Sequence, residues 1–505
     1  MNQRSRGSYR WNILDLFITM LAVGLALMMA TAQAQVQLDR LSTDTFTNSS
    51  SQHATEVEPD TYSYGSTIVT AFQVGRIEDG GASDIGFATS TNGGASWTNG
   101  FLPGITTFYQ RGKYTAVSDA SVVFDAAHST WLISSLAITN AVGVAVLASS
   151  SSDGITWNNP ATVNSTPSGF TDKDWISCDN TSTSLYYGHC YVEWEDAYQG
   201  DQVRMSTSSD GGHTWSAAFN VPNAFGLGGQ PIVQPNGTAV VPFLGNGIQV
   251  FTSTDGGKTW GNLTQVAGVT DHAVNGNLRA VYTLPSADID AAGTVYVAWW
   301  DCRFRTNCSS NDIVMSISSD AKTWSPVTRI PIDLTTSTVD HFIPGIAVDH
   351  TTSGSTAHIG VTYYFYPVAN CTTKTCKLGV GFISSTNGGK AWTKAKGLTK
   401  GMNTGWLPTT TLGQMVGDYI STSYVNGKAF GVFAKASAKS GTTFNEAMFT
   451  PATGFFVEGE GPYLSSEGDK PVPNAKSDHP PVPYFDSEGR VPKPPSKEAP
   501  PEPEH

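Results

Sequence analysis

The chain carries few charged residues for its length, and it has no surplus of basic ones. Only 14% of its 505 residues are Asp, Glu, Lys or Arg, against about 25% in an average globular domain. Lys and Arg number 29 and Asp and Glu number 42, which gives a formal net charge of −13. We expect no nucleic-acid partner, because no basic stripe is available to meet phosphates.

Motifs of metal, nucleotide and hydrolase sites are also missing. The six cysteines include no Cys-x2-Cys pair, and the histidines form no His-Glu-x-x-His segment. The stretch 256–259 has Thr252 where a phosphate-binding loop needs its first glycine. No Gly-x-Ser-x-Gly elbow occurs. We therefore expect no metal and no cofactor.

Only one apolar run is long enough to suggest a membrane segment. Three arginines between residues 4 and 10 precede the apolar run Leu16–Met29, and small residues at 30–34 offer cleavage sites. This pattern predicts a signal peptide over residues 1–34 and a secreted or periplasmic protein. An uncleaved N-terminal anchor is the alternative, although the run is short for a full span. No second run follows, so we expect no membrane span after signal removal.

Six copies of one short motif run through the chain, with the pattern Ser-x-Asp/Asn-Gly-Gly-x-Thr-Trp. They span residues 90–97, 151–157, 208–215, 253–260, 318–324 and 385–392, and two of them are one residue short. Asp-Gly or Asn-Gly between β-rich runs supplies the positive φ angles of a tight hairpin turn. The Trp can pack beneath the turn. Self-similarity at a long period predicts a repeat architecture in which these residues hold turns.

The motif resembles the Asp-box of the sialidase superfamily, a set of secreted β-propellers. The resemblance covers roughly residues 55–450. It implies an all-β propeller with its Asp-box turns on the face away from the active site.

Counting the repeats favours seven four-stranded blades over residues 35–460. Successive motif tryptophans lie 45 to 68 positions apart, which leaves room for four strands and their loops. Residues 415–420, 429–434 and 444–450 read as strands of a seventh blade without a motif. The segment near 36–45 could supply its fourth strand and close the ring, which removes exposed edges. Six blades is the alternative.

Composition changes after Gly461. Eleven prolines lie between positions 471 and 503, together with Lys and Glu. Such a segment cannot bury a core, so residues 461–505 are predicted to be a disordered, Pro-rich, solvated tail. A spacer or a ligand for other proteins is the alternative.

The six cysteines fit an oxidising compartment and fall into sequence-local pairs. Fifteen connectivities are possible in principle. We expect the local set because each pair would close a short connection. The predicted disulfides are Cys178–Cys190, Cys302–Cys308 and Cys371–Cys376.

Polar residues gather in the loops expected opposite the Asp-box turns. If these turns join third to fourth strands, the second-to-third loops and the segments leading into each first strand open on the other face. Carboxylates, arginines and aromatics together suit a sugar site. The alternative is that many of these acids cap turns. The set comprises Arg76, Glu78, Asp79, Glu193, Glu195, Asp196, Asp301, Arg303, Arg305, Glu58, Asp60, Asp119, Asp172 to Trp175, Asp288, Asp418 and Tyr419.

The resemblance is weaker for the reaction than for the fold. Catalytic sialidases use an Arg-Ile-Pro segment in blade one, an Asp acid/base, a Glu-paired Tyr nucleophile and further arginines, which together bind a substrate carboxylate. This chain has Glu58-Pro59-Asp60 where the first Arg is expected and Gln230 in the strand that would carry the Glu. Its one Arg-Ile-Pro, at 329–331, follows the fifth motif.

The resemblance still implies a sialidase-like glycoside hydrolase that acts on glycans as a monomer. A non-catalytic propeller that binds glycan or protein is the alternative. The candidate catalytic residues are Asp79 as acid/base, Tyr419 as nucleophile, and Glu195. The candidate substrate-binding residues are Arg76, Arg279, Arg303, Trp175, Trp300, Asp301 and Asp418.

Overall fold

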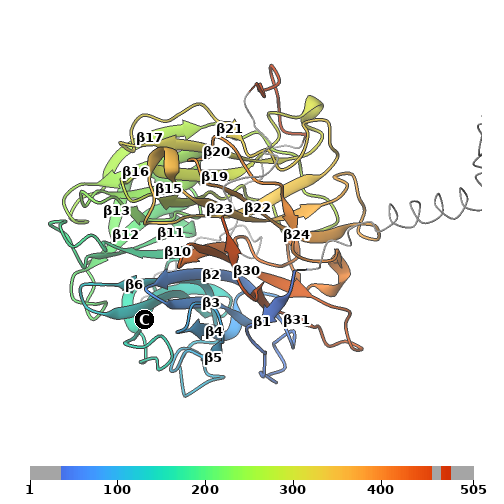
Figure 1. Ribbon diagram of the computed structural model, residues 1–505. Helices are drawn as coiled ribbons and strands as arrows, with labels where there is room; N and C mark the ends of the chain where they lie inside the picture. The colour runs from blue at the N-terminus through green and yellow to red at the C-terminus, as the bar shows by residue number, and fades with distance from the viewer. Residues whose placement is uncertain (1–35, 458–467, 479–505) are drawn as a thin grey trace, which may run out of the picture. The chain divides into compact units, whose positions relative to one another are not determined.

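A computed structural model describes residues 36–457 and 468–478 of the chain (Figure 1). The described residues from Gln37 onward belong to one compact unit of antiparallel strands with four short 3-10 turns. None of the helices in these two ranges is long and apolar enough to cross a membrane. The predicted signal peptide at 1–34 and most of the predicted tail lie outside the described residues.

The strands form seven successive groups of four, which we call units one to seven. Unit one contains β2 (Glu56–Tyr64), β3 (Thr67–Arg76), β4 (Ala82–Ser90) and β5 (Thr98–Phe101). Unit two contains β6 (Ala116–Asp125), β7 (Thr130–Thr139), β8 (Val142–Ser151) and β9 (Ala161–Ser165). Unit three contains β10 (Thr171–Cys178), β11 (Cys190–Asp196), β12 (Gln202–Ser208) and β13 (Phe219–Phe225). Unit four contains β14 (Ile232–Val233), β15 (Ala239–Gly245), β16 (Gly247–Ser253) and β17 (Gly261–Ala267).

The remaining units follow the same plan. Unit five contains β18 (Ser286–Ile289), β19 (Val295–Asp301), β20 (Asp312–Ser318) and β21 (Thr328–Arg329). Unit six contains β22 (Asp340–Val348), β23 (Ile359–Tyr366), β24 (Lys377–Ser385) and β25 (Lys396–Gly397). Unit seven contains β29 (Ser421–Val425), β30 (Lys428–Ala436), β31 (Glu446–Pro451) and β1 (Leu38–Arg40). The short elements are β26 (Met402–Asn403), β27 (Thr409–Thr410), β28 (Gly413–Gln414), β32 (Phe455–Phe456), η1 (Ala197–Gln199), η2 (Thr306–Cys308), η3 (Gly354–Thr356) and η4 (Thr404–Trp406).

The first and last parts of the described chain meet in unit seven. Strand β1 pairs antiparallel with β31, with Leu38 opposite Pro451 (Figure 1). The prediction that the segment near 36–45 supplies this fourth strand is confirmed. The first strands also contact one another in cyclic order, from β2 through β6, β10, β14, β18 and β22 to β29, and β29 contacts β2.

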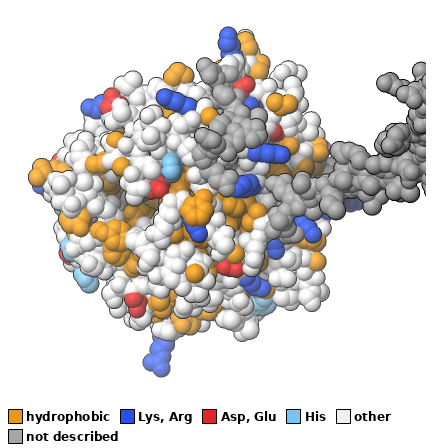
Figure 2. Space-filling view, viewed as in Figure 1, with side chains coloured by type: hydrophobic (Ala, Val, Ile, Leu, Met, Phe, Trp, Pro, Cys, Tyr) orange, Lys and Arg blue, Asp and Glu red, His pale blue; other side chains and the backbone are white. Residues whose placement is uncertain are grey.

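The core lies between neighbouring units, because both faces of each sheet are covered. In β7, Trp131 and Ile133 pack toward unit one, whereas Leu132 and Leu136 pack toward unit three. This alternation is the two-residue period of a strand with two buried faces. Figure 2 shows that the face in view is mostly uncharged, with scattered charged side chains.

The six motifs all connect the third to the fourth strand of their units, as predicted. In the third motif the Ser208 hydroxyl accepts a bond from the Gly212 N–H at 3.0 Å and donates to Asp210 Oδ1 at 2.9 Å. Asp210 Oδ1 in turn accepts the Thr214 N–H at 2.9 Å. The Trp215 indole donates to the Gly212 carbonyl at 3.0 Å. These bonds confirm that the motif residues hold a turn.

All three predicted disulfides are present. Cys178 and Cys190 lie directly opposite each other on β10 and β11. The other two bridges, Cys302–Cys308 and Cys371–Cys376, close loops within units five and six.

Candidate functional site

Bulges near the start of several first strands aim charged side chains away from the regular pleat. The pairing register shifts within β2, β6, β10 and β22. One residue at each shift has a positive φ: Glu58 at 55°, Asp119 at 42°, Lys173 at 51° and Ile343 at 49°. Such angles are uncommon for residues other than glycine, and bulges commonly redirect a side chain. Three of the four redirected residues are charged.

These redirected residues form a buried charged cluster around Lys173. The Lys173 ammonium lies 2.5 Å from Asp418 Oδ2, 3.5 Å from Asp119 Oδ1 and 3.9 Å from Glu58 Oε1. Arg279 donates to both carboxylate oxygens of Asp418, from Nε at 2.9 Å and from Nη2 at 2.7 Å. Asp418 is therefore held between two cations, with the paired geometry that makes guanidinium–carboxylate contacts strong.

Burial and mutual contact set the protonation of this cluster. Burial alone would raise the pKa of Asp418, but Arg279 and Lys173 hold that pKa well below its usual range. Burial raises the pKa of Glu58 to about 7, with Lys173 opposing the rise. Burial would lower the pKa of Lys173, but the neighbouring carboxylates of Asp119 and Asp418 raise it well above its usual value. At neutral pH Lys173 is charged and Asp418 is ionised.

A second group of acids lies beside this cluster in unit three. Asp174 on β10 and Glu193 and Glu195 on β11 are at most 2% exposed. Burial raises the pKa of each of the three well above its ordinary value, so all three favour the protonated form. Among the described residues, neither carboxyl oxygen of Asp174 has a hydrogen-bond partner.

A small cavity lies beside Asp174, between unit three and the segment that leads into unit four. Its volume is about 10 Å³, roughly the space of one water molecule. The rings of Trp175 and Tyr419 meet edge to face at its wall, with centroids 5.1 Å apart and an interplanar angle of 80°. The Tyr419 hydroxyl has no hydrogen-bond partner among the described residues, and burial raises its pKa well above the usual value. The lining residues are Lys173, Asp174, Trp175, Gly228, Gly229, Gln230, Leu284 and Tyr419.

Gly229 permits the close approach of units three and four at this cavity. A Cβ atom at Gly229 would lie 2.5 Å from the Glu193 carboxyl carbon. Any larger residue would therefore displace Glu193 from its place behind the cavity wall.

The connection between β17 and β18, which we call the 268–285 connection, brings two residues to the site. Arg279 reaches Asp418, and Leu284 lines the cavity. The connection is fixed near both ends of its course, because the Thr270 carbonyl accepts the Cys302 N–H at 2.6 Å and the Arg279 N–H donates to the Gln414 carbonyl at 2.7 Å. Gly276 packs close to Cys376, so two disulfide-closed loops contact the connection.

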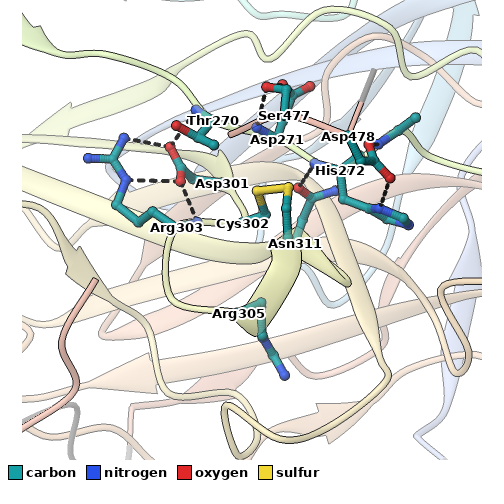
Figure 3. The surroundings of a disulfide bond; sticks show 12 residues. Thr270, Asp271, His272, Asp301, Cys302, Arg303, Arg305, Asn311, Ser477 and Asp478 are labelled. Atoms are coloured by element: carbon teal, nitrogen blue, oxygen red, sulfur yellow. Dashed lines mark hydrogen bonds and ion pairs between the residues drawn. A yellow bond between two sulfur atoms is a disulfide. The ribbon is translucent and has the colours of Figure 1, made fainter. Parts of the chain in front are cut away.

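Part of the Pro-rich segment is fixed to the start of this connection (Figure 3). The Asp478 carboxylate lies 2.6 Å from His272 Nδ1, and its other oxygen accepts the Ala273 N–H at 2.9 Å. The Ser477 hydroxyl donates to Asp271 at 2.9 Å. Residues 468–478 thus make specific contacts with this connection, whereas the rest of the predicted disordered tail stays a prediction.

The structure brings four of the predicted site residues together. Arg279, Asp418, Tyr419 and Trp175 meet around Lys173 and the cavity, and Glu195 belongs to the adjacent acid group.

The other predicted site residues lie outside this group. Asp79 is exposed in the turn between β3 and β4. The Arg76 guanidinium donates to the carbonyls of Ile77, at 2.8 Å, and Gly81. Trp300 is 1% exposed.

Asp301 and Arg303 bind each other in unit five (Figure 3). Arg303 donates from Nε to Asp301 Oδ1 at 2.9 Å and from Nη2 to Oδ2 at 2.6 Å. Cys302, which lies between them in sequence, is bonded to Cys308.

The sequence alone gave no role to Lys173, Glu58 or Asp119. It identified them only as polar residues that lead into first strands. The sequence pattern that could have revealed them is Glu-Pro in one segment and Asp-Lys-x-Trp in another. Each pattern puts a charged residue inside a buried strand, where it needs a partner.

One further group has the composition of a cation site. Ligand atoms of Asp312, Asp333 and His341 lie within 4.8 Å of one another. Arg305 already binds both carboxylates, with Nη2 at 2.5 Å from Asp312 and 2.6 Å from Asp333. A bound metal would have to displace this guanidinium, so these residues fit a structural ion-pair network better than a metal centre.

Sequence comparison identifies the repeat. Residues 179–405 match the family described as BNR repeat-like domain. The resemblance to the Asp-box proteins of the sialidase superfamily is thereby confirmed for this region. No curated protein matches the sequence.

Structural comparison finds proteins of low sequence identity. An ulvan lyase, a polysaccharide lyase, is 11% identical, with 87% of this chain and 99% of that chain covered and a TM-score of 0.46. The Trypanosoma rangeli sialidase is 12% identical, with 69% and 59% covered and a TM-score of 0.43. The NanB sialidase from Streptococcus pneumoniae is 12% identical, with 81% and 70% covered and a TM-score of 0.39. Because these TM-scores lie below 0.5, we draw nothing from them about blade count or reaction.

Proposed function

We propose that this protein is an exported glycoside hydrolase built on a seven-bladed β-propeller. Seven four-stranded units, the cyclic contacts of their first strands and the β1–β31 pairing support the propeller. Three disulfides and the apolar N-terminal run support export. The Asp-box repeat supports a role in carbohydrate chemistry.

The observation that carries the proposal is the position of Asp174. This buried carboxyl lines the cavity beside Trp175 and Tyr419, and burial raises its pKa well above the usual value, which favours the protonated form. A glycosidase needs a carboxylic acid that retains its proton until it donates to the leaving group. Trp175 is half-buried at the cavity wall, where an aromatic ring can stack on a sugar face.

In this proposal Asp174 protonates the glycosidic oxygen as the bond to the anomeric carbon breaks. A water molecule then attacks that carbon and passes its proton to the carboxylate left on Asp174, which restores the acid. Tyr419 keeps its phenolic proton because its pKa is raised, which favours a hydrogen-bonding role over the nucleophilic one that the resemblance implies. A cavity for one water cannot hold a sugar, so the cavity has to widen when substrate enters.

The test is a panel of 4-methylumbelliferyl glycosides, including a sialoside, with wild type and two variants. We expect wild type to cleave at least one neutral glycoside and Asp174→Asn to lower kcat by about 100-fold or more. Asp84→Asn is the matched control, because Asp84 is also buried with a raised pKa but does not line the cavity. Release by wild type no faster than by Asp174→Asn would contradict the proposal.

The small volume of the cavity favours one alternative, a binding propeller without catalysis. Saturable binding on a glycan array, together with no release from any glycoside, would support this alternative. The same array would then identify the ligand.

A further inference from the structure

Five arginines of the described residues, Arg279 at the site and four outside it, are committed to partners within the chain. Their planar guanidinium groups are the natural binders of a substrate carboxylate or sulfate. The pairings are Arg76 with the carbonyls of Ile77 and Gly81, Arg279 with Asp418, Arg303 with Asp301, Arg305 with Asp312 and Asp333, and Arg329 with Asp469 and Asp312.

The two cations of the site, Lys173 and Arg279, are likewise paired with carboxylates of the chain. Lys173 and Arg279 share the Asp418 carboxylate, and Asp119 and Glu58 lie within 3.9 Å of Lys173. These side chains are at most 4% exposed. A ligand carboxylate could reach the two cations only by displacing Asp418. That step would leave a buried carboxylate uncompensated, which is strongly unfavourable.

Apart from Lys173, the described residues that line the cavity carry no positive charge and offer several hydrogen-bonding groups. Asp174 has two carboxyl oxygens, and Tyr419 a hydroxyl, without hydrogen-bond partners among the described residues. Glu193 lies directly behind Gly229, so an anion in the cavity would face a carboxyl on this side as well. A sugar hydroxyl can instead accept from Tyr419 and donate to Asp174, which satisfies buried groups that cost free energy when unpaired.

We infer that the site recognises uncharged, hydroxyl-bearing sugar units and discriminates against units that carry a carboxylate or a sulfate. This inference rests on the proposed function and names its substrate class. It departs from what the sialidase resemblance implies, because a sialic acid carries a carboxylate and this site has no uncommitted cation to bind it.

The experiment measures binding of the purified full-length protein to matched pairs of neutral and acidic glycans. The pairs are lactose and sialyllactose, galactan and polygalacturonate, and mannan and polymannuronate. We expect at least one neutral member to bind about 100-fold or more tightly than its acidic partner. Raising sodium chloride from 20 to 500 mM should change its affinity less than about twofold, since screening acts on charged contacts.

The other possible results of the binding experiment overturn either this inference alone or the proposed function as well. An acidic member that binds as tightly as its neutral partner, or more tightly, overturns this inference while the proposed function stands. An affinity for the neutral member that falls steeply with salt also overturns it. If neither member of any pair binds and no glycoside is cleaved, the proposed function fails and this inference fails with it.

A pair of variants tests the source of the discrimination. Asp418→Asn removes the carboxylate that Arg279 and Lys173 share, so we expect the preference for the neutral member to fall about 10-fold or more. The matched control is Asp312→Asn, because Asp312 is also buried and bound by two cations, Arg305 and Arg329. Neither of these cations lines the cavity, whereas Lys173 beside Asp418 does. We expect the control to keep the preference within about twofold.

Two outcomes of the variant experiment would overturn the inference. One is an unchanged preference in folded Asp418→Asn, and the other is an equal shift in Asp312→Asn. If circular dichroism shows that Asp418→Asn does not fold, the glycan pairs and the salt series measured on wild type still test whether the site prefers uncharged sugar units.

Discussion

Replacing Lys173 with methionine should be among the most damaging changes in the protein. Lys173 is the cation nearest to three buried carboxyl groups, those of Asp418, Asp119 and Glu58. Methionine has a similar volume but no charge, so Asp119 and Glu58 would lose their nearby cation out of water, and Asp418 would keep only Arg279. Removing one member of a buried ion pair typically costs about 3–5 kcal/mol. We expect a loss of that size in the free energy of unfolding at pH 8.

The loss should be smaller at pH 5, and Glu58 supplies the reason. Its folded pKa of about 7 lies above its ordinary 4.5, so its contribution to stability is complete below pH 4.5 and is lost as the pH rises to 7. Lys173 opposes this rise in wild type. Without Lys173 the folded pKa rises further, and the folded variant keeps its proton at pH 8. One retained proton costs about 1.4 kcal/mol for each pH unit above 7.

Urea unfolding followed by tryptophan fluorescence at pH 5 and pH 8 measures both quantities. Lys435→Met is the control, since Lys435 is only partly buried and lies over the Phe449 ring. We expect the control to lose no more than about 1 kcal/mol. A loss below about 1 kcal/mol for Lys173→Met at pH 8, or an equal loss at both pH values, would refute the reasoning. Glu58→Gln added to Lys173→Met should remove most of the difference between the two pH values.

Three further predictions concern the turns, the disulfides and the Pro-rich segment. Gly257→Ala should destabilise the protein by more than about 1 kcal/mol, because Gly257 has φ 82° and a Cβ would lie 2.2 Å from the Thr207 hydroxyl; Gly261→Ala, with open space around its Cβ, should be nearly neutral in thermal melts. Replacing Cys302 and Cys308 with serine should cost about 2 kcal/mol by loop entropy, and an unchanged melting temperature would count against a bridge in the purified protein. Asp478→Ala should speed amide hydrogen exchange at Ala273, whose N–H it accepts at 2.9 Å; exchange as slow as in wild type would show that residues 468–478 do not bind there in solution.

The candidate site could be predicted from the sequence only in part. Trp175, Asp418 and Tyr419 were identifiable because charged and aromatic residues stand out in segments that otherwise read as buried strands. Their partner Arg279 was identifiable only as a candidate, since the 268–285 connection carries no repeat signal. The grouping of Lys173 with Glu58 and Asp119 depends on bulges with positive φ, and no residue pattern in those strands announces a positive φ at a Glu, an Asp or a Lys. Asp79, by contrast, was predicted as a catalytic residue from its place in a loop, but in the structure it is exposed to solvent.

What the sequence determined by itself is the local structure. The Asp-box turns, the β-rich units between them and the three disulfides follow from contacts within a few residues of one another, or within one strand pair, so short-range chemistry was enough to predict them. Tertiary structure alone decided which charges meet, because Asp418 pairs with Lys173 and Arg279 across 245 and 139 positions of sequence. Pairings over such separations depend on how the first strands of different units pack together. Their free energy comes from burial, which no local segment of this chain can supply by itself.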